Sequence, residues 1–307
     1  MSANTAKPRQ SQALRDPTAA ARASKGWWRA NKWLLLRRAC QLGLLGLFLV
    51  GPISVWLQRQ GLLGRAWWPV EGNLASSLTL DTLPLTDPFM LLQSLAAGHL
   101  PEAAALLGAA IVLAFYGLIG GRMYCSWFCP VNPVTDFAAW LRRKLRIKGS
   151  RTPPEGIRRW LVLVVLLVSA ATGVIAWEWV NPVSMLHRAL VFGAGAAWGV
   201  VAVVFLYDLL IAPRGWCGHL CPVGAFYGQV GRGALLRVAA PRRRACDDCM
   251  DCFQVCPEPH VIRPALKAAG QDHPVILSPD CTACGRCVDV CSQDVFRLTT
   301  RFNRSEL

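Results

Sequence analysis

The sequence has 307 residues, of which 53% are apolar, and its formal net charge is +15. The mean hydropathy of +0.33 is high, and too few polar segments exist to cover the apolar ones. These values exclude an ordinary soluble domain and indicate a membrane protein. The basic balance does not indicate nucleic-acid binding, because the basic residues flank apolar runs instead of forming one patch on a soluble domain.

Four uncharged apolar runs of about 18 residues or more are long enough to cross a hydrocarbon core of about 30 Å as helices. They cover residues 40–57, 103–121, 160–177 and 189–207. The first run follows a long charged tail, and no small-residue cleavage pattern comes after it. We therefore expect a retained membrane anchor there and not a cleaved signal.

The basic residues predict how the chain crosses the membrane. Residues 1–38 hold nine Lys or Arg against one acid, and residues 122–159 hold nine against two, so these blocks carry +8 and +7. Lys and Arg accumulate on the cytoplasmic side. We therefore expect a multi-pass protein of the bacterial inner membrane with both termini in the cytoplasm and residues 58–101 outside. Most of the cysteines then lie in a reducing compartment, which favours metal or redox roles over disulfides.

Two runs of four cysteines, CDDCMDCFQVCP and CTACGRCVDVCS, share the spacing C-x2-C-x2-C-x3-C. This is the pattern of bacterial two-cluster ferredoxins, in which the fourth cysteine of each run ligates the other cluster. Zinc sites use two C-x2-C pairs per ion and fit this spacing poorly. We expect the acids between the cysteines, including Asp289, to be solvated. The predicted ligands are Cys246, Cys249, Cys252 and Cys291 for cluster 1, and Cys281, Cys284, Cys287 and Cys256 for cluster 2.

A shorter motif, C-x3-C-P, occurs twice, each time just after an even-numbered apolar run. It contains Cys125 and Cys129 (the first pair) and, 92 residues later, Cys217 and Cys221 (the second pair). Two thiols are too few for a closed zinc or iron–sulfur site, but the repeat presents four at one membrane boundary. We expect the pairs to bind an additional metal or to cycle as dithiols, and the alternative is that they only shape turns. Asn132 is expected to cap the helix that follows the first pair.

These motifs divide the chain into four predicted parts. They are a basic cytoplasmic tail (1–38), a four-span membrane domain with the first pair (39–212), a connector with the second pair (213–245) and a two-cluster ferredoxin-type domain (246–307). The predicted fold class is an α-helical membrane protein with four transmembrane helices and a C-terminal cytoplasmic ferredoxin-like module that binds two [4Fe–4S] clusters.

Four spans, two C-x3-C-P pairs and the paired cysteine runs together resemble the NapH family, the membrane component of a quinol dehydrogenase that serves periplasmic nitrate reductase. The resemblance implies that membrane quinol is the electron donor. It also implies a periplasmic multi-cluster ferredoxin partner that passes the electrons to nitrate reductase. The chain would be a redox subunit that is not catalytic alone, and no catalytic residue is assigned. The stretches that carry the resemblance are GWWR, LRRACQ, TDPFMLLQSLAAGHLP, CSWFCPVNPVTD, WEWVNPVS, GWCGHLCPVGA, CMDCFQVCPEPHV and CGRCVDVCSQDVF.

A second class of function fits the same residues. The chain lacks the extra domains of two relatives with this core, the flavin-bearing regulator of nitrous oxide reduction and the cytochrome oxidase assembly protein, whereas the methylamine-utilisation relative is of similar size. The alternative is therefore an assembly or maturation factor that delivers electrons or metal to another redox enzyme. In either case the predicted clusters lie inside and the implied acceptor lies outside, so a carrier must span about 30 Å of hydrocarbon.

Overall fold

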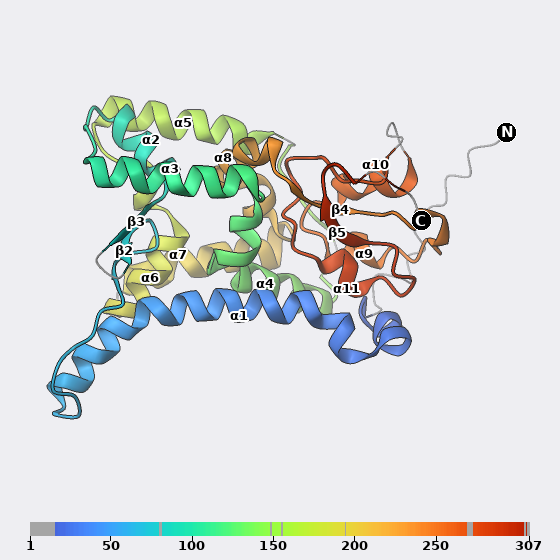
Figure 1. The fold of residues 1–307 in the computed structure, drawn as a ribbon, viewed down its shortest axis with the longest axis horizontal. Coiled ribbons are helices and arrows are strands. Elements are labelled where there is room, and N and C mark those ends of the chain that lie inside the picture. The colour runs from blue at the N-terminus through green and yellow to red at the C-terminus, as the bar shows by residue number, and fades with distance from the viewer. Residues whose placement is uncertain are drawn as a thin grey trace.

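The computed structural model describes residues 16–79, 82–147, 149–154, 156–193, 195–268, 273–303 and 305. The first 15 residues of the predicted basic tail lie outside this range. The chain forms a helical part, residues 19–233, and a smaller C-terminal part, residues 236–303, that lies against one end of it (Figure 1). Strands β1 to β3 lie at the opposite end of the helical part.

Helix α1 (Ala19–Arg59) runs along the helical part, and its beginning reaches the C-terminal part (Figure 1). It contains the predicted first span, and Gly26 bends it with a φ of 81° that glycine adopts readily. Among the described residues, it is the one helix that is both long and apolar enough to cross a membrane. At about 1.5 Å per residue it is about 60 Å long, so it also extends beyond a hydrocarbon core.

Three shorter helices occupy the other predicted spans, namely α3 (Ala103–Leu118), α5 (Ile157–Thr172) and α7 (Gly195–Leu206). Helix α7 continues into the π turn η4 (Tyr207–Ile211). Sixteen residues of helix rise about 24 Å, which is less than the thickness of about 30 Å to be crossed. The three further spans therefore remain a prediction.

The apolar run 189–207 is not one helix, contrary to the expectation from its hydropathy. Its first residues belong to α6 (Pro182–Phe192), which Asn181 caps by accepting a hydrogen bond from the Val183 amide at 3.1 Å. Gly193 then takes a φ of 63° and ends α6, and α7 packs beside α6 instead of extending it. Hydropathy does not reveal this break, because a glycine turn leaves the run as apolar as a continuous helix would be.

Residues of the segment 58–101, which is predicted to lie outside, form the end of the helical part that is farthest from the C-terminal part. A short antiparallel sheet has the strand order β1-β2-β3, with Val70 opposite Thr79 and Ser76 opposite Thr86. The short helix that follows begins after Asp87, whose side chain accepts a hydrogen bond from the Phe89 amide. The elements here are β1 (Val70–Gly72), β2 (Ser76–Thr79), β3 (Leu83–Thr86) and α2 (Pro88–Ala96).

The C-terminal part is a two-stranded ribbon with three short helices around one apolar core. Strand β4 (Leu236–Ala239) pairs antiparallel with β5 (Arg297–Thr300). The core includes Val238, Ile262 and Val290 together with three of the cysteines. Strand β4 lies in the predicted connector, so the connector supplies one strand of this part. The helices are α9 (Asp251–Val255), α10 (Ile262–Lys267) and α11 (Arg286–Val290).

The expected orientation in the membrane is open to a direct test. An alkaline phosphatase domain fused after Leu307 is expected to be inactive, and the same domain inserted near Ser77 is expected to be active. The reason is that the basic blocks predict a cytoplasmic C-terminal part and an outside position for the sheet. Phosphatase activity of both fusions in intact cells is the measurement. An active C-terminal fusion with an inactive sheet fusion would reverse the topology.

Candidate metal centres

The eight cysteines of the two four-cysteine runs line two separate cavities in the C-terminal part. Each cavity holds one of the predicted ligand sets, so the fourth cysteine of each run crosses to the cavity of the other run. No three His, Cys, Asp or Glu side chains of the described residues converge closely enough to hold a single metal ion. Thiols spread around a cavity suit a four-iron cluster better. Cys246, Cys249, Cys252 and Cys291 line one cavity, and Cys256, Cys281, Cys284 and Cys287 line the other.

The two runs share a backbone conformation that suits an anionic group. The residues two and four positions after the first cysteine have left-handed φ angles, at Asp248 and Met250 in one run and at Ala283 and Gly285 in the other. Left-handed residues in such loops turn successive backbone N–H groups to one side and form a concave anion site. A cluster bound by four thiolates carries the negative charge that such a site favours.

The chemistry of the thiols also fits a cluster. Burial raises the pKa of Cys281 to about 11 and that of Cys249 to about 12, so both thiols are neutral near pH 7 when no cation is bound. Ligation requires thiolates, and cluster binding therefore releases protons and supplies the positive charge that buried thiolates need. Phe253 and Phe296 line the cluster 1 cavity and limit the access of water.

Replacing Cys256 by alanine is expected to remove cluster 2 and to leave cluster 1, although Cys256 belongs to the run that supplies three ligands of cluster 1. Iron in anaerobically purified protein should fall from about eight to about four atoms per chain. Iron and acid-labile sulfide analysis measures this, and Cys40→Ala, a lone cysteine of α1, serves as the control. Selective loss of cluster 1, or a wild-type preparation that contains zinc in place of iron, would contradict the ligand assignment.

The two C-x3-C-P pairs are structurally repeated as well as repeated in sequence. Each first cysteine lies in a five-residue π turn, η2 (Tyr124–Phe128) or η5 (Trp216–Leu220), at the same offset of 92 residues. Each second cysteine is extended and is followed by a helix, α4 (Val131–Lys144) or α8 (Pro222–Val230). The repeat therefore presents the two pairs in matching local frames.

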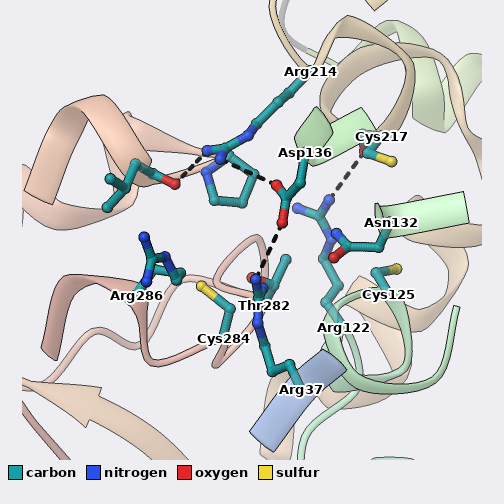
Figure 2. A pocket seen from close by; sticks show the side chains of 12 residues that line it. Arg37, Arg122, Cys125, Asn132, Asp136, Arg214, Cys217, Thr282, Cys284 and Arg286 are labelled. Atoms are coloured by element: carbon teal, nitrogen blue, oxygen red, sulfur yellow. Dashed lines mark hydrogen bonds and ion pairs between the residues drawn. The ribbon is translucent and has the colours of Figure 1, made fainter. Parts of the chain in front are cut away.

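The structure brings the four thiols of the pairs into one neighbourhood. Burial is the main cause that raises the pKa of Cys129, Cys217 and Cys221, to about 12 for Cys221, and the nearby Cys125 thiol raises each of them further. Cys125 and Cys217 line a cavity that Cys284 of cluster 2 also lines. Figure 2 shows Cys125 and Cys217 on one side of this cavity and Cys284 on the other. The first cysteine of each pair thus lines the same cavity as a predicted ligand of cluster 2.

Backbone carbonyls of the segment 280–285, which we call the cluster 2 loop, attach it to the first pair. Ser126 donates a hydrogen bond from Oγ to the carbonyl of Thr282 at 2.7 Å, and the Trp127 indole donates to the carbonyl of Ala283 at 3.2 Å. Arg122 donates to the carbonyl of Asp280 at 2.7 Å. These three contacts fix the loop against the π turn that holds Cys125.

A buried group of charges joins the same two regions. The Glu258 carboxylate accepts hydrogen bonds from Arg122 at 2.7 Å and from Arg158 at 2.5 Å, and it is 4% exposed. Arg158 also pairs with Asp280. Burial alone would raise the pKa of Asp280, but His260, Arg158 and Arg122 outweigh it and lower the pKa to about 2. Glu258 follows Cys256 by two residues and Asp280 precedes Cys281, so the arginines position the segments that carry these predicted ligands of cluster 2.

The second arginine of the repeat has an equivalent role. Arg214 stands three residues before Cys217, as Arg122 stands before Cys125, and it pairs with Asp136 at 3.1 Å. Arg37 and Arg38 of α1 pair with the same carboxylate at 3.2 and 2.5 Å. Burial would raise the pKa of Asp136, but these three cations lower it to about 2. Asp136 therefore stays ionised and ties α1 and the second pair to helix α4.

Two sequence-based expectations about single residues are wrong. Asp289 is not solvated: it is 0% exposed and accepts hydrogen bonds from the amides of Trp33 and Leu34 at 3.0 and 2.9 Å. Asn132 does not cap α4, which begins one residue earlier. Its side-chain oxygen instead accepts hydrogen bonds from Gln41 and Arg38.

Sequence reasoning also missed the charged residues that join the cysteine pairs to cluster 2. Arg122 and Arg214 repeat with the 92-residue offset, and this regularity was the available signal. The acids that pair with these arginines, Glu258 and Asp136, lie far from their partners in the sequence and belong to no recognisable motif.

Two cysteine-lined cavities in one small domain, with matching loops and buried thiols, define a ferredoxin-type iron–sulfur protein. The family model described as "4Fe-4S binding domain" matches residues 103–148 and 192–243, which include both cysteine pairs. The model described as "4Fe-4S dicluster domain" matches residues 245–295. The chain belongs to the family of ferredoxin-type electron-transfer proteins that includes NapH and MauN.

Three relatives cover almost the whole chain. The "Ferredoxin-type protein NapH" of Escherichia coli (strain K12) is 52% identical over 292 residues, which are 94% of this chain and 96% of that protein. NapH of Haemophilus influenzae is 48% identical over 91% of this chain and 94% of its own length. The "Methylamine utilization ferredoxin-type protein MauN" of Methylorubrum extorquens is 54% identical over 91% of this chain and 93% of its own length. No solved structure matches the chain.

Proposed function

We propose that this chain takes electrons from membrane quinol and passes them through the cysteine pairs to cluster 2 and then to cluster 1. From there the electrons pass toward periplasmic nitrate reductase through a ferredoxin-type partner. The cysteine pairs hold an additional metal centre or cycle as dithiols between the quinol and cluster 2. Cys125, Cys129, Cys217 and Cys221 are the residues assigned to this step.

The observation that carries the proposal is the attachment of the cluster 2 loop to the first pair. Ser126, Trp127 and Arg122 contact three neighbouring carbonyls of that loop. This arrangement fixes the relative positions of the cysteine pair and cluster 2. Such fixed placement is what electron transfer between two centres requires, whereas a turn-shaping role would not need contacts to the other domain.

The two clusters supply one-electron storage when they are bound. The residues of this chain hold them with eight thiolates, surround them with apolar side chains and orient cluster 2 through Glu258 and Asp280. Left-handed loop residues add backbone N–H groups toward each cluster. The order cluster 2 before cluster 1 follows from which ligand loop contacts the cysteine pairs.

Purified protein in liposomes, given a reduced quinone, tests the proposal. Anaerobic addition of a naphthoquinol is expected to bleach the cluster absorbance and to produce the EPR signals of reduced [4Fe–4S] clusters. Dithionite serves as the positive control for reducible clusters. Clusters that dithionite reduces and no quinol reduces would overturn the quinol-oxidising role.

A role in maturation is the second candidate, and the 54% identity to MauN favours it. A maturation factor would deliver electrons or metal from the cysteine pairs to another redox enzyme. Metal bound at the pairs should then leave the protein when an apo-acceptor is added. Retention of that metal together with quinol-dependent cluster reduction would exclude this second function.

A further inference from the structure

A cavity lies at the end of the helical part that is farthest from the clusters. It is bounded by the second half of α1, by α6 and by the segment around β1 (Figure 1). Its volume is about 340 Å³, within the range of about 300–1,000 Å³ in which proteins bind small molecules. The lining is almost entirely apolar and aromatic, and includes Phe48, Pro52, Trp56, Trp68 and Phe192, with Arg59 at its edge.

Gly51 and Ser54 of α1 hold the segment with Trp68, which forms one wall of this cavity, against the helix. Trp68 packs on Gly51, where an added Cβ would lie 2.2 Å from the indole ring. The Trp67 amide donates a hydrogen bond to Oγ of Ser54 at 3.1 Å, so the segment before β1 is fastened to the helix. The wall is therefore a fixed part of the fold.

Besides Arg59, a histidine faces this apolar space. His187 of α6 is 7% exposed and contacts the Phe48 ring edge-on, with 5.7 Å between the ring centroids. Its ring nitrogens have no hydrogen-bond partner among the described residues. These nitrogens are not among the fully buried unpartnered atoms of the described residues, so they face accessible space in which a ligand can supply a hydrogen bond.

We propose that this cavity binds the ring of the membrane quinol and that His187 accepts a hydrogen bond from one quinol hydroxyl. The inference rests on the quinol-oxidising function proposed above. An aromatic ring with a hydroxyl matches an apolar wall with one hydrogen-bonding group. Exposed Trp56 and Phe192 at the cavity lie on the apolar surface of the helical part, which gives a lipid-soluble ligand a route from the bilayer.

The cavity is linked to the cysteine pairs by packed side chains. Leu186, the neighbour of His187, belongs to a hydrophobic cluster with Val131, and Cys129 packs against that cluster. Along α1, Gln41 donates a hydrogen bond to the carbonyl of Ser126 at 2.8 Å, and Phe48 lies seven residues further on. Seven residues of helix rise about 10 Å. A short path therefore joins the quinol ring to the first pair.

Oxidation of one quinol releases two electrons, which is the number that the two clusters together can accept. The quinol loses its two O–H bonds and becomes the quinone, and it releases two protons and two electrons. His187 takes the first proton at its free ring nitrogen and returns it to water at the edge of the cavity before it takes the second. When both clusters are bound, each would accept one of these two electrons by way of the cysteine pairs.

His187 is proposed both to hydrogen-bond the quinol and to accept its proton, and measurements of binding and of turnover in His187 variants separate these two roles. The probe is the fluorescent quinol mimic 2-heptyl-4-hydroxyquinoline N-oxide, titrated into detergent-purified holoprotein. His187→Leu is expected to weaken binding about tenfold, the loss of one hydrogen bond. His187→Gln should bind within about threefold of the wild type yet oxidise naphthoquinol about 100-fold more slowly, since glutamine takes up no proton.

Two further variants test whether the cavity itself is the binding site and whether any histidine replacement has the same effect. Val191→Phe fills the cavity without removing a polar contact, and it should abolish probe binding. His99→Gln is the matched control, because His99 is exposed and bonded to the carbonyl of Gly173 at 2.9 Å, away from the cavity. Iron content and dithionite-reducible clusters confirm that each variant is folded.

The outcomes distinguish this site from the proposed function as a whole. Wild-type protein that binds the probe and oxidises quinol, together with His187→Leu and Val191→Phe variants that do so equally well, would overturn the cavity as the quinol site and leave the function standing. An equal loss in His99→Gln would also overturn it. If the wild type neither binds the probe nor oxidises quinol, the proposed function fails and the site fails with it.

Discussion

Replacing Cys125 and Cys217 together by alanine is expected to abolish quinol-dependent cluster reduction while the clusters themselves remain. Eight cysteines already fill the two ligand sets, and these two thiols line the cavity next to Cys284 of cluster 2. The rate of cluster reduction by quinol should fall by at least about 100-fold, because the loss of a mere outer partner of a metal site already costs about 10- to 100-fold and these thiols are assigned to the transfer step itself.

The measurement combines iron analysis with stopped-flow absorbance on the same liposomes. Iron at the two ferredoxin-type clusters and their reduction by dithionite should stay at wild-type values. Cys40→Ala provides a control that removes a thiol of α1 outside the pairs. Undiminished quinol-dependent reduction in the double variant would mean that the pairs only shape turns. Loss of the two clusters would show that the ligand assignment is wrong.

The second large effect is expected from Glu258→Gln. This change removes the carboxylate that pairs with the buried Arg122 and Arg158. The loss of one partner from a buried ion pair destabilises a protein by about 3–5 kcal/mol. Glu258 follows Cys256 by two residues, so the cluster 2 loop should also lose its fixed position against the first pair. We therefore expect lower thermal stability together with slower reduction of cluster 2.

Asp16→Asn is the matched control, because Asp16 pairs with Arg22 at 3.1 Å and both side chains are about half exposed. An exposed pair contributes about 0–1 kcal/mol. The midpoint of thermal loss of cluster absorbance, recorded in one detergent, compares the two variants. A Glu258→Gln protein that is as stable as Asp16→Asn would show that the buried charges do not hold the two parts together.

The sequence predicted local features well where chemistry and spacing are regular. The paired cysteine runs indicated two iron–sulfur sites, and the family comparison confirms the [4Fe–4S] binding domains. The repeat of the C-x3-C-P pairs suggested four thiols at one place, and the matching π turns at Tyr124 and Trp216 explain how the repeat presents them. The resemblance to NapH is likewise confirmed.

Features that depend on contacts between distant segments could not be predicted from the sequence. Asp289 looked like one of several acids in a polar loop, and only the approach of Trp33 and Leu34 shows why it is buried. Glu258 is 136 residues from Arg122, and no spacing rule connects them. Gly193 ends a helix that the hydropathy pattern predicts to be continuous, because a left-handed backbone conformation costs glycine little free energy.

Electrons are proposed to reach cluster 2 before cluster 1, and variants that lack one cluster at a time test this order. Cys284→Ala is expected to lose cluster 2, and Cys249→Ala to lose cluster 1, with iron analysis confirming which cluster remains. Freeze-quenched EPR after mixing with naphthoquinol should show a reduced cluster 2 in Cys249→Ala. In Cys284→Ala, cluster 1 should stay oxidised with quinol and become reduced with dithionite. Rapid reduction of cluster 1 by quinol in the absence of cluster 2 would contradict the proposed path.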